Sequence, residues 1–233
     1  MDLTDSQLTL LEQGEIISCE LTPVGSNYTF LVELRLDGDY GYGIYKPRKG
    51  EIPLWDFPSG TLYKRECAAY LLSEILGWDF IPYTLIRDGP HGIGSVQHYV
   101  EHNPKENYYT LDESSADQLK QVACFDLVAN NTDRKAGHVL IDPDGKLWGI
   151  DQGLTFHEDT KIRTVIWDFA GDPIPDHLLE TLLNFMKSLE SPQGRMLDLL
   201  ELLLPEEISS LHRRLEWVLG DGSFPGLPGR RRG

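Results

Sequence analysis

The stretch that most constrains the fold of this chain is NNTDRKAGHVLIDPDGKLWGIDQGLTF, from residue 130 to residue 156. Within it, two apolar segments at 139–141 and 146–150 flank the turn Asp-Pro-Asp-Gly. Proline fixes φ, aspartate bonds its own backbone and glycine accepts a positive φ, so the sequence predicts a tight β-hairpin. The hairpin would bring the carboxylates of Asp133 and Asp151 together, in an arrangement suited to binding a metal and orienting a hydroxyl group.

The spacing of charged residues around this hairpin favours catalysis. A single Asp-Arg pair such as Asp133-Arg134 is usually a solvated ion pair in a loop, which is the alternative to a catalytic role. Here Lys135, His138 and Asp151 follow it. In kinases, a catalytic-loop Asp orients the acceptor hydroxyl, and an Asn and a second Asp hold Mg²⁺. Asp133 has the position of the first Asp, Asp151 that of the second, and His138 that of the Asn.

The runs Asn-Thr-Asp-Arg (131–134) and Ile-Asp-Gln-Gly-Leu (150–154) resemble the phosphatidylinositol 3-/4-kinase superfamily. The resemblance is strongest to the type II phosphatidylinositol 4-kinases and to small bacterial proteins similar to them, and it covers residues 15 to 180. It implies a two-lobed protein-kinase-like α+β fold of the atypical-kinase type, with an antiparallel N-lobe sheet and a mostly helical C-lobe. It also implies ATP and a divalent ion, Mg²⁺ or Mn²⁺, as cofactors.

The resemblance implies a role for each matching residue. Asp133 would orient or deprotonate the acceptor, and Lys135, beside Arg134, would offset charge on the γ-phosphoryl group. Asp151 and His138 would bind the metal. An imidazole is a softer ligand than the asparagine that these kinases have, so His138 favours Mn²⁺ or another transition ion over Mg²⁺.

The N-lobe is expected over residues 1–101. A helix is predicted over 3–13, because Thr4 or Asp5 can cap it. Segments rich in β-branched and aromatic residues predict a mainly antiparallel sheet, and Asp37-Gly38 marks a hairpin within it. The predicted strands lie in EIISCELTPV, TFLVELRL, YGIYKP, FIPYTLIRDG and GIGSVQHYVEHN.

Lys46 ends the third predicted strand, where a kinase places the lysine that binds the α- and β-phosphates of ATP. Such a lysine needs a carboxylate partner on the next helix, which LYKRECAAYLLSEILG provides. Glu66 is the predicted partner. Glu74 is the second candidate, about 12 Å farther along the helix axis. The alternative is a surface lysine and a solvated glutamate.

Two further segments are candidates for nucleotide binding. Ser26 and Asn27 lie in the turn that a kinase folds over the phosphates, although an ordinary β-turn explains them as well. Tyr99, Val100 and Glu101 form the expected hinge, whose backbone would pair with the adenine edge. The insertion PRKGEIPLWDFPSGT, after Lys46, is either a substrate flap or a packing element.

The C-lobe is expected over residues 102–222. A helix over 116–128 leads into the catalytic loop, and Asp126 within it is expected to anchor that loop rather than to catalyse. Amphipathic helices close the lobe. Residues 223–233 are rich in Gly, Pro and Arg and are expected to be a disordered tail.

The composition of the chain limits the kinds of partner and the compartment that can be expected for it. The formal net charge is −16, which argues against nucleic acid or an anionic membrane, since both require a basic surface. Three scattered cysteines indicate a reducing compartment. No signal peptide and no apolar run long enough to span a bilayer is visible in the sequence, so a cytoplasmic protein is expected.

The sequence thus predicts an ATP-dependent kinase. It would transfer the γ-phosphoryl group to a hydroxyl of a lipid headgroup, an inositol or polyol metabolite, or a protein Ser/Thr. The alternatives are a non-catalytic nucleotide-binding pseudokinase and an interaction module. The sequence specifies neither the acceptor nor the oligomeric state.

Overall fold

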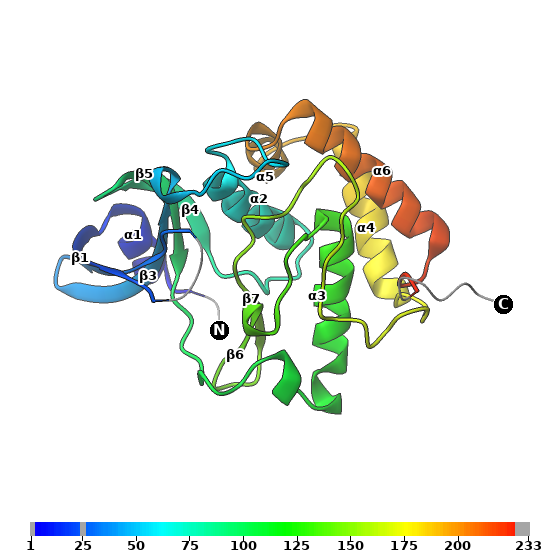
Figure 1. Ribbon diagram of the computed structural model, residues 1–233, viewed down its shortest axis with the longest axis horizontal. Coiled ribbons are helices and arrows are strands. Elements are labelled where there is room, and N and C mark those ends of the chain that lie inside the picture. The colour runs from blue at the N-terminus through cyan, green and yellow to red at the C-terminus, as the bar shows by residue number, and fades with distance from the viewer. Residues whose placement is uncertain (1–2, 24–26, 227–233) are drawn as a thin grey trace.

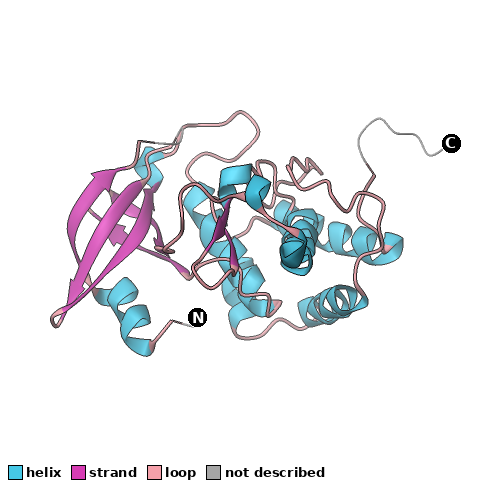
Figure 2. Cartoon of the chain, turned by 90° about the horizontal axis from the view of Figure 1, so that it is seen from below, coloured by secondary structure: helices cyan, strands magenta, loops and turns pink. Residues whose placement is uncertain are grey.

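The computed structural model of the 233-residue chain describes residues 3–23 and 27–226. The strands of the main sheet gather at one end of the molecule and most helices at the other (Figures 1 and 2). This arrangement confirms the predicted α+β fold, with an antiparallel sheet beside a mostly helical part.

The main sheet, within the described residues, has five antiparallel strands in the order β1-β2-β3-β5-β4. Phe30, Val32 and Leu34 alternate along β2 and are buried, as expected for a strand with one face on a core. Asp37 and Gly38 join β2 to β3 with φ of 51° and 97°, the positive values that a two-residue hairpin turn requires. The strands are β1 Glu15–Leu21, β2 Phe30–Leu36, β3 Asp39–Pro47, β4 Thr84–Gly89 and β5 Gly92–His98.

Helix α1 (Asp5–Gln13) packs against this sheet. Thr4 Oγ1 accepts the Gln7 N–H at 3.3 Å, and Gln7 Oε1 accepts the Thr4 N–H at 2.9 Å. This capping box satisfies backbone donors at the start of the helix and confirms Thr4 as the cap. Leu10 and Leu11 are buried in a small core beneath the sheet.

The helical part has one large core, to which α2 also contributes Cys67, Ala68 and Leu72. Because α2 packs against β4 and β5 as well, it couples the sheet to the helices. The helices are α2 Leu62–Ile75, α3 Ala116–Ala129, α4 Asp176–Leu189, α5 Arg195–Glu201 and α6 Pro205–Asp221. Short 3₁₀ turns are η1 Arg48–Gly50, η2 Tyr108–Thr110, η3 Glu113–Ser115 and η4 Ala136–His138.

The predicted hairpin is confirmed as β6 (Val139–Ile141) and β7 (Leu147–Gly149). Its turn is held by one side chain. Asp142 Oδ1 accepts the Asp144 N–H at 3.0 Å and the Lys146 N–H at 2.9 Å, and Asp142 Oδ2 accepts Trp148 Nε1–H at 2.8 Å. This aspartate therefore fixes where the chain leaves the hairpin toward Asp151.

The prediction that the tail is disordered from residue 223 is wrong for its first residues. Ser223 pairs with Pro173, and the Phe224 N–H donates to Asp172 O at 2.9 Å. The Phe224 side chain is buried against Phe169, because an aromatic ring can bury apolar area that composition alone does not reveal. Residues 227–233 of the predicted tail lie outside the described residues.

Over the same described ranges, no helix is both long enough and apolar enough to cross a bilayer.

Candidate active site

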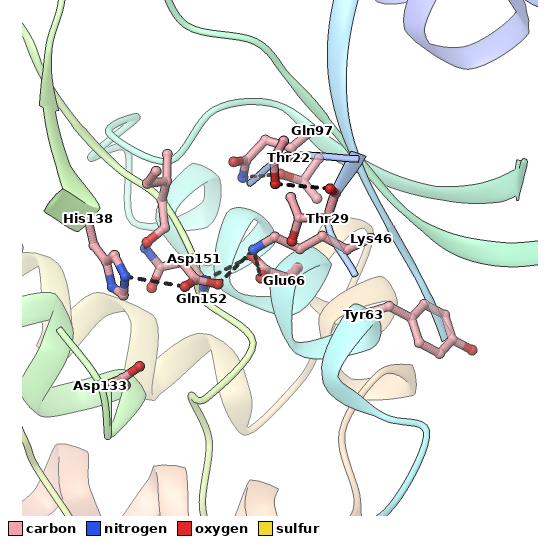
Figure 3. Close-up of polar contacts among 12 residues, drawn as sticks. Thr22, Thr29, Lys46, Tyr63, Glu66, Gln97, Asp133, His138, Asp151 and Gln152 are labelled. Atoms are coloured by element: carbon pink, nitrogen blue, oxygen red, sulfur yellow. Dashed lines mark hydrogen bonds and ion pairs between the residues drawn. The ribbon is translucent and has the colours of Figure 1, made fainter. Parts of the chain in front are cut away.

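A cleft of about 510 Å³ lies where the sheet meets α2 and the β6–β7 hairpin. Binding pockets for small molecules measure roughly 300–1,000 Å³, so this volume suits a nucleotide. The polar residues that line it include Asn27, Thr29, Lys46, Glu51, Glu66, Gln97, His98, His102, Asp133, Lys135, His138 and Asp151. Figure 3 shows most of these side chains converging from separate elements.

Lys46, near the end of β3, lies between two carboxylates. Its Nζ contacts the Glu66 carboxylate and donates to Asp151 Oδ1 at 2.8 Å (Figure 3). Burial by itself lowers the pKa of an ammonium group, but the charges of Asp151 and Glu66 outweigh it and raise the pKa of Lys46 above its usual value. Lys46 is therefore a cation at neutral pH, held in the cleft on both sides.

Glu66, rather than Glu74, contacts Lys46. The Glu66 side chain is almost fully buried, and its Oε2 accepts the Gln152 N–H at 2.9 Å. Glu74, two turns later on α2, lies 3.3 Å from Arg195 Nε instead. Glu66 thus joins β3, α2 and the backbone after Asp151 in one ionic network.

Asp151 adopts a left-handed backbone conformation with φ 59°. The charge of Lys46 holds the pKa of Asp151 well below its usual range, although burial opposes that effect. Asp151 Oδ2 lies 3.3 Å from His138 Nε2. Burial lowers the pKa of His138 even though Asp151 opposes it, so the imidazole is neutral at pH 7, the form that binds metal ions.

Asp133 lies on the loop after α3, separate from the Lys46 network but lining the same cleft (Figure 3). Its backbone N–H donates to Asn131 Oδ1 at 2.9 Å, which fixes the loop. Lys135 Nζ donates to Asp133 Oδ2 at 2.6 Å, and the Lys135 side chain is 62% exposed. The carboxylate and the ammonium group are therefore both accessible from the cleft.

Arg134, which the sequence suggested as a catalytic residue beside Asp133, does not line the cleft. It is 2% exposed, and its guanidinium donates to Asp126 at 2.9 and 2.8 Å. Asn131 Nδ2 also donates to Asp126, at 3.1 Å. Arg134 and Asp126 therefore support the loop that carries Asp133 from beneath, and the expected catalytic position of Arg134 is corrected to a structural one.

Two of the three expected hinge residues line the cleft. Tyr99 and Val100 line the cleft, whereas Glu101 is exposed and lies outside the lining. Of the turn residues, Asn27 lines the cleft, and its Oδ1 accepts the Ile52 N–H at 2.7 Å. Ser26 lies outside the described residues.

The insertion between β3 and α2 has two kinds of contact: part of it packs against the segment after Asp151, and part of it lines the cleft. Lys161 Nζ, from the segment after Asp151, lies 3.2 Å from Asp56 Oδ2 and 5.0 Å from the centroid of the Trp55 ring. The Trp55 side chain is 92% exposed. Glu51 reaches the cleft, where its Oε1 accepts the Tyr63 N–H at 2.9 Å.

Sequence reasoning missed Glu51 and Gln97 as cleft residues. Glu51 lies in an irregular insertion, where no periodicity predicts the direction of a side chain. Gln97 could have been found from its strand, because it is two residues before Tyr99 and faces the same side of the sheet as Ile44 and Lys46.

Within the described part of the chain, no group of three or more His, Cys, Asp or Glu side chains is arranged to hold a metal ion. Asp151 and His138 are two candidate ligands. Mg²⁺ is commonly bound through one or two carboxylates together with phosphates of the substrate. The donor set therefore fits an ion that arrives with a nucleotide rather than one bound by the protein alone.

Comparison with known proteins finds one relative that matches over nearly the whole chain and others that match over part of it. Protein Rv2133c of Mycobacterium tuberculosis is 37% identical over 99% of this chain and 95% of its own length. Phosphatidylinositol 4-kinase gamma 3 of Arabidopsis thaliana is 28% identical over 58% of this chain, which spans 24% of that kinase. The structure of hydra Fam20 with sugar matches at a TM-score of 0.57 and 13% identity, covering 94% of this chain and 89% of that one. No protein-family model matches the chain.

Proposed function

The chain belongs to the family of protein Rv2133c and has a kinase-like fold, and from this premise we propose that it is an ATP-dependent phosphotransferase. The observation that carries the proposal is the position of Lys46 between Glu66 and Asp151, in the cleft that Asp133 also lines. A strand-borne ammonium, a helix-borne carboxylate and two separate aspartates are the parts that kinases use.

In this proposal, the two parts of the chain divide the work. Residues 1–101 bind the nucleotide, with Lys46 on the α- and β-phosphates and the backbone near Val100 on the base. Residues 102–222 carry the transfer. Asp133 orients the acceptor hydroxyl and takes its proton, and Lys135 offsets charge on the γ-phosphoryl group. Catalysis is then mainly positioning and electrostatic stabilisation.

The charges in the cleft support a requirement for a divalent ion. Two lysines, Lys46 and Lys135, face four carboxylates among the lining residues. A strongly anionic triphosphate would be repelled by this excess of negative charge. A bound Mg²⁺ or Mn²⁺ would supply the missing positive charge, and Asp151 with His138 would hold it. The four carboxylates are Glu51, Glu66, Asp133 and Asp151.

The acceptor is a hydroxyl group of a lipid headgroup, an inositol or polyol metabolite, or a protein Ser/Thr. The second candidate function is a pseudokinase that binds nucleotide without turnover. One observation favours it. His138 stands where kinases have a metal-binding asparagine, as expected of a metal site that has lost one of its ligands.

The test combines nucleotide binding with transfer. The protein is heated with ATP plus Mg²⁺, ATP plus Mn²⁺, or ATP plus a chelator, and transfer from γ-labelled ATP is measured with inositol lipid vesicles, free inositol and a Ser/Thr peptide. We expect metal-dependent stabilisation of roughly 2.7 kcal/mol at a hundredfold excess over Kd. Asp133→Asn should reduce transfer by about 10²–10⁴ and keep the thermal response.

The alternatives give different results. Stabilisation by ATP without transfer to any acceptor, under either metal, would establish the pseudokinase. The absence of any thermal response to ATP would contradict nucleotide binding and leave an interaction module.

A further inference from the structure

The inner wall of the cleft contains a buried amide with a defined orientation. Gln97, at the end of β5, is 6% exposed and lines the cleft, directly before the segment that includes Tyr99 and Val100. It pairs in register with Ile44 on β3 and with Thr84 on β4. Figure 3 shows Gln97 in the same view of the cleft as Lys46, which lies two residues after Ile44.

Thr84 fixes which end of the amide faces it. Thr84 Oγ1 lies 2.8 Å from the carbonyl oxygen of Pro82 and 2.9 Å from Gln97 Nε2. A carbonyl can only accept, so the single hydroxyl hydrogen of Thr84 goes to Pro82. The hydroxyl oxygen must then accept from Gln97, which places Nε2 rather than Oε1 beside it.

The amide oxygen is therefore a free acceptor. Thr84 is buried beside Gln97 on the neighbouring strand and does not line the cleft, whereas Gln97 does. Within the described ranges, no donor of the protein is bonded to Gln97 Oε1. This oxygen is not one of the fully buried unpaired atoms, so it is open to the cleft and can accept a hydrogen bond from a bound ligand.

The backbone that follows Gln97 supplies a hydrogen-bond donor that complements this acceptor. The Tyr99 N–H already donates to Tyr42 O at 3.2 Å, and Val100 O lies 2.8 Å from His102 Nδ1. The Val100 N–H has no backbone acceptor among the described residues. The wall thus offers Gln97 Oε1 as an acceptor and the Val100 N–H as a donor.

We propose that Gln97 determines base specificity by accepting a hydrogen bond from the 6-amino group of adenine, an inference that depends on the nucleotide binding proposed above. Adenine carries an amino donor at position 6 and an acceptor at N1, which matches this acceptor and donor. Guanine carries a carbonyl acceptor at position 6 and a hydrogen on N1. Its oxygen would face Gln97 Oε1, so the site selects ATP over GTP.

The experiment isolates the 6-amino group. Affinities of ATP and of purine riboside triphosphate, which lacks only that group, are measured with Mn²⁺ by titration calorimetry. The wild-type protein should prefer ATP by roughly three- to tenfold, the range of one neutral hydrogen bond. Gln97→Met should bind both nucleotides equally. GTP should bind more weakly than either nucleotide to the wild-type protein.

Two variants at Thr84 test the orientation of the amide. Thr84→Val removes the hydroxyl that fixes Gln97, so the preference for ATP should fall, while the matched Thr84→Ser should keep it. If these residues had only a structural role, the substitutions would weaken the binding of both nucleotides equally and leave the ratio of the two affinities unchanged. Melting temperatures without nucleotide show that each variant is folded.

The possible failures are distinguishable. Equal wild-type affinity for ATP and purine riboside triphosphate would overturn this inference and leave the proposed function intact. A Gln97→Met variant that keeps the full preference would also overturn it. If no nucleotide binds to the wild-type protein, the proposed function itself fails, and this inference fails with it.

Discussion

The buried ion pair between Arg65 and Glu207 gives a sharp test of how the helix that carries Glu66 is held. Arg65, on α2, contacts the Glu207 carboxylate at the start of α6, and the two residues are 2% and 5% exposed. Arg65 Nη1 also donates to Thr155 O at 2.6 Å. Arg65 thus connects α2 both to α6 and to the segment after Asp151.

Removing one partner leaves an uncompensated buried charge, which costs about 3–5 kcal/mol. Glu207→Gln should therefore lower the free energy of unfolding by about 3 kcal/mol while still capping α6, because Glu207 Oε2 accepts the Leu204 N–H at 2.9 Å. Arg65→Met should cost at least as much, since Thr155 O also loses its donor. For a chain of this length, such a loss corresponds to about 10 °C in Tm.

The assay is urea unfolding of both single variants and of the double variant. The double variant carries neither charge, so it should be about 2 kcal/mol more stable than the sum of the single effects predicts. The matched control is Arg195→Met, which breaks the half-exposed pair between Arg195 on α5 and Glu74 on α2 and should cost less than the loss of either Arg65 or Glu207. Strict additivity of the single effects, or an equal cost for the control, would refute the reasoning.

Three further outcomes are expected. His138→Asn should shift the ratio of Mn²⁺- to Mg²⁺-supported transfer toward Mg²⁺, measured as initial rates; an unchanged ratio would mean that His138 does not ligate the ion. Asp151→Gly should be about 1 kcal/mol more stable to urea than Asp151→Ala, because φ is 59° at this position, and the usual order with alanine more stable would contradict this. Burial raises the pKa of Cys67 and Cys124 to about 12, so both stay protonated at pH 8 and a thiol reagent should label at most one of the three cysteines of the native chain.

The sequence predicts the regular elements well because their physical signals are local. The turn Asp37-Gly38 and the side-chain bonds of Asp142 act within a few residues. The choice of Glu66 over Glu74 also follows from local geometry, since the start of α2 is the end near Lys46. Each of these features can be inferred without knowing how distant parts of the chain meet.

The rest depends on contacts between distant segments or on irregular backbone. Arg134 directly follows Asp133, yet one side chain is buried on Asp126 and the other lines the cleft. In a loop without a repeating period, adjacent residues give no signal of direction. The pairing of Arg65 with Glu207 joins residues 142 positions apart, and neither residue has a motif that identifies the other.

The backbone at Asp151 connects the fold to the proposed chemistry. A non-glycine residue with φ 59° carries strain, which persists only where surrounding contacts fix the conformation. Here the residues on both sides are fixed. The Ile150 N–H donates to His138 O at 3.0 Å, and the Gln152 N–H donates to buried Glu66 at 2.9 Å. Since Glu66 also contacts Lys46, the same carboxylate positions the strained backbone and the cation that Asp151 faces. In this left-handed conformation the Asp151 carboxylate lies 2.8 Å from Lys46 Nζ and 3.3 Å from His138 Nε2, so the contacts that fix the backbone also fix the position of the proposed metal ligand.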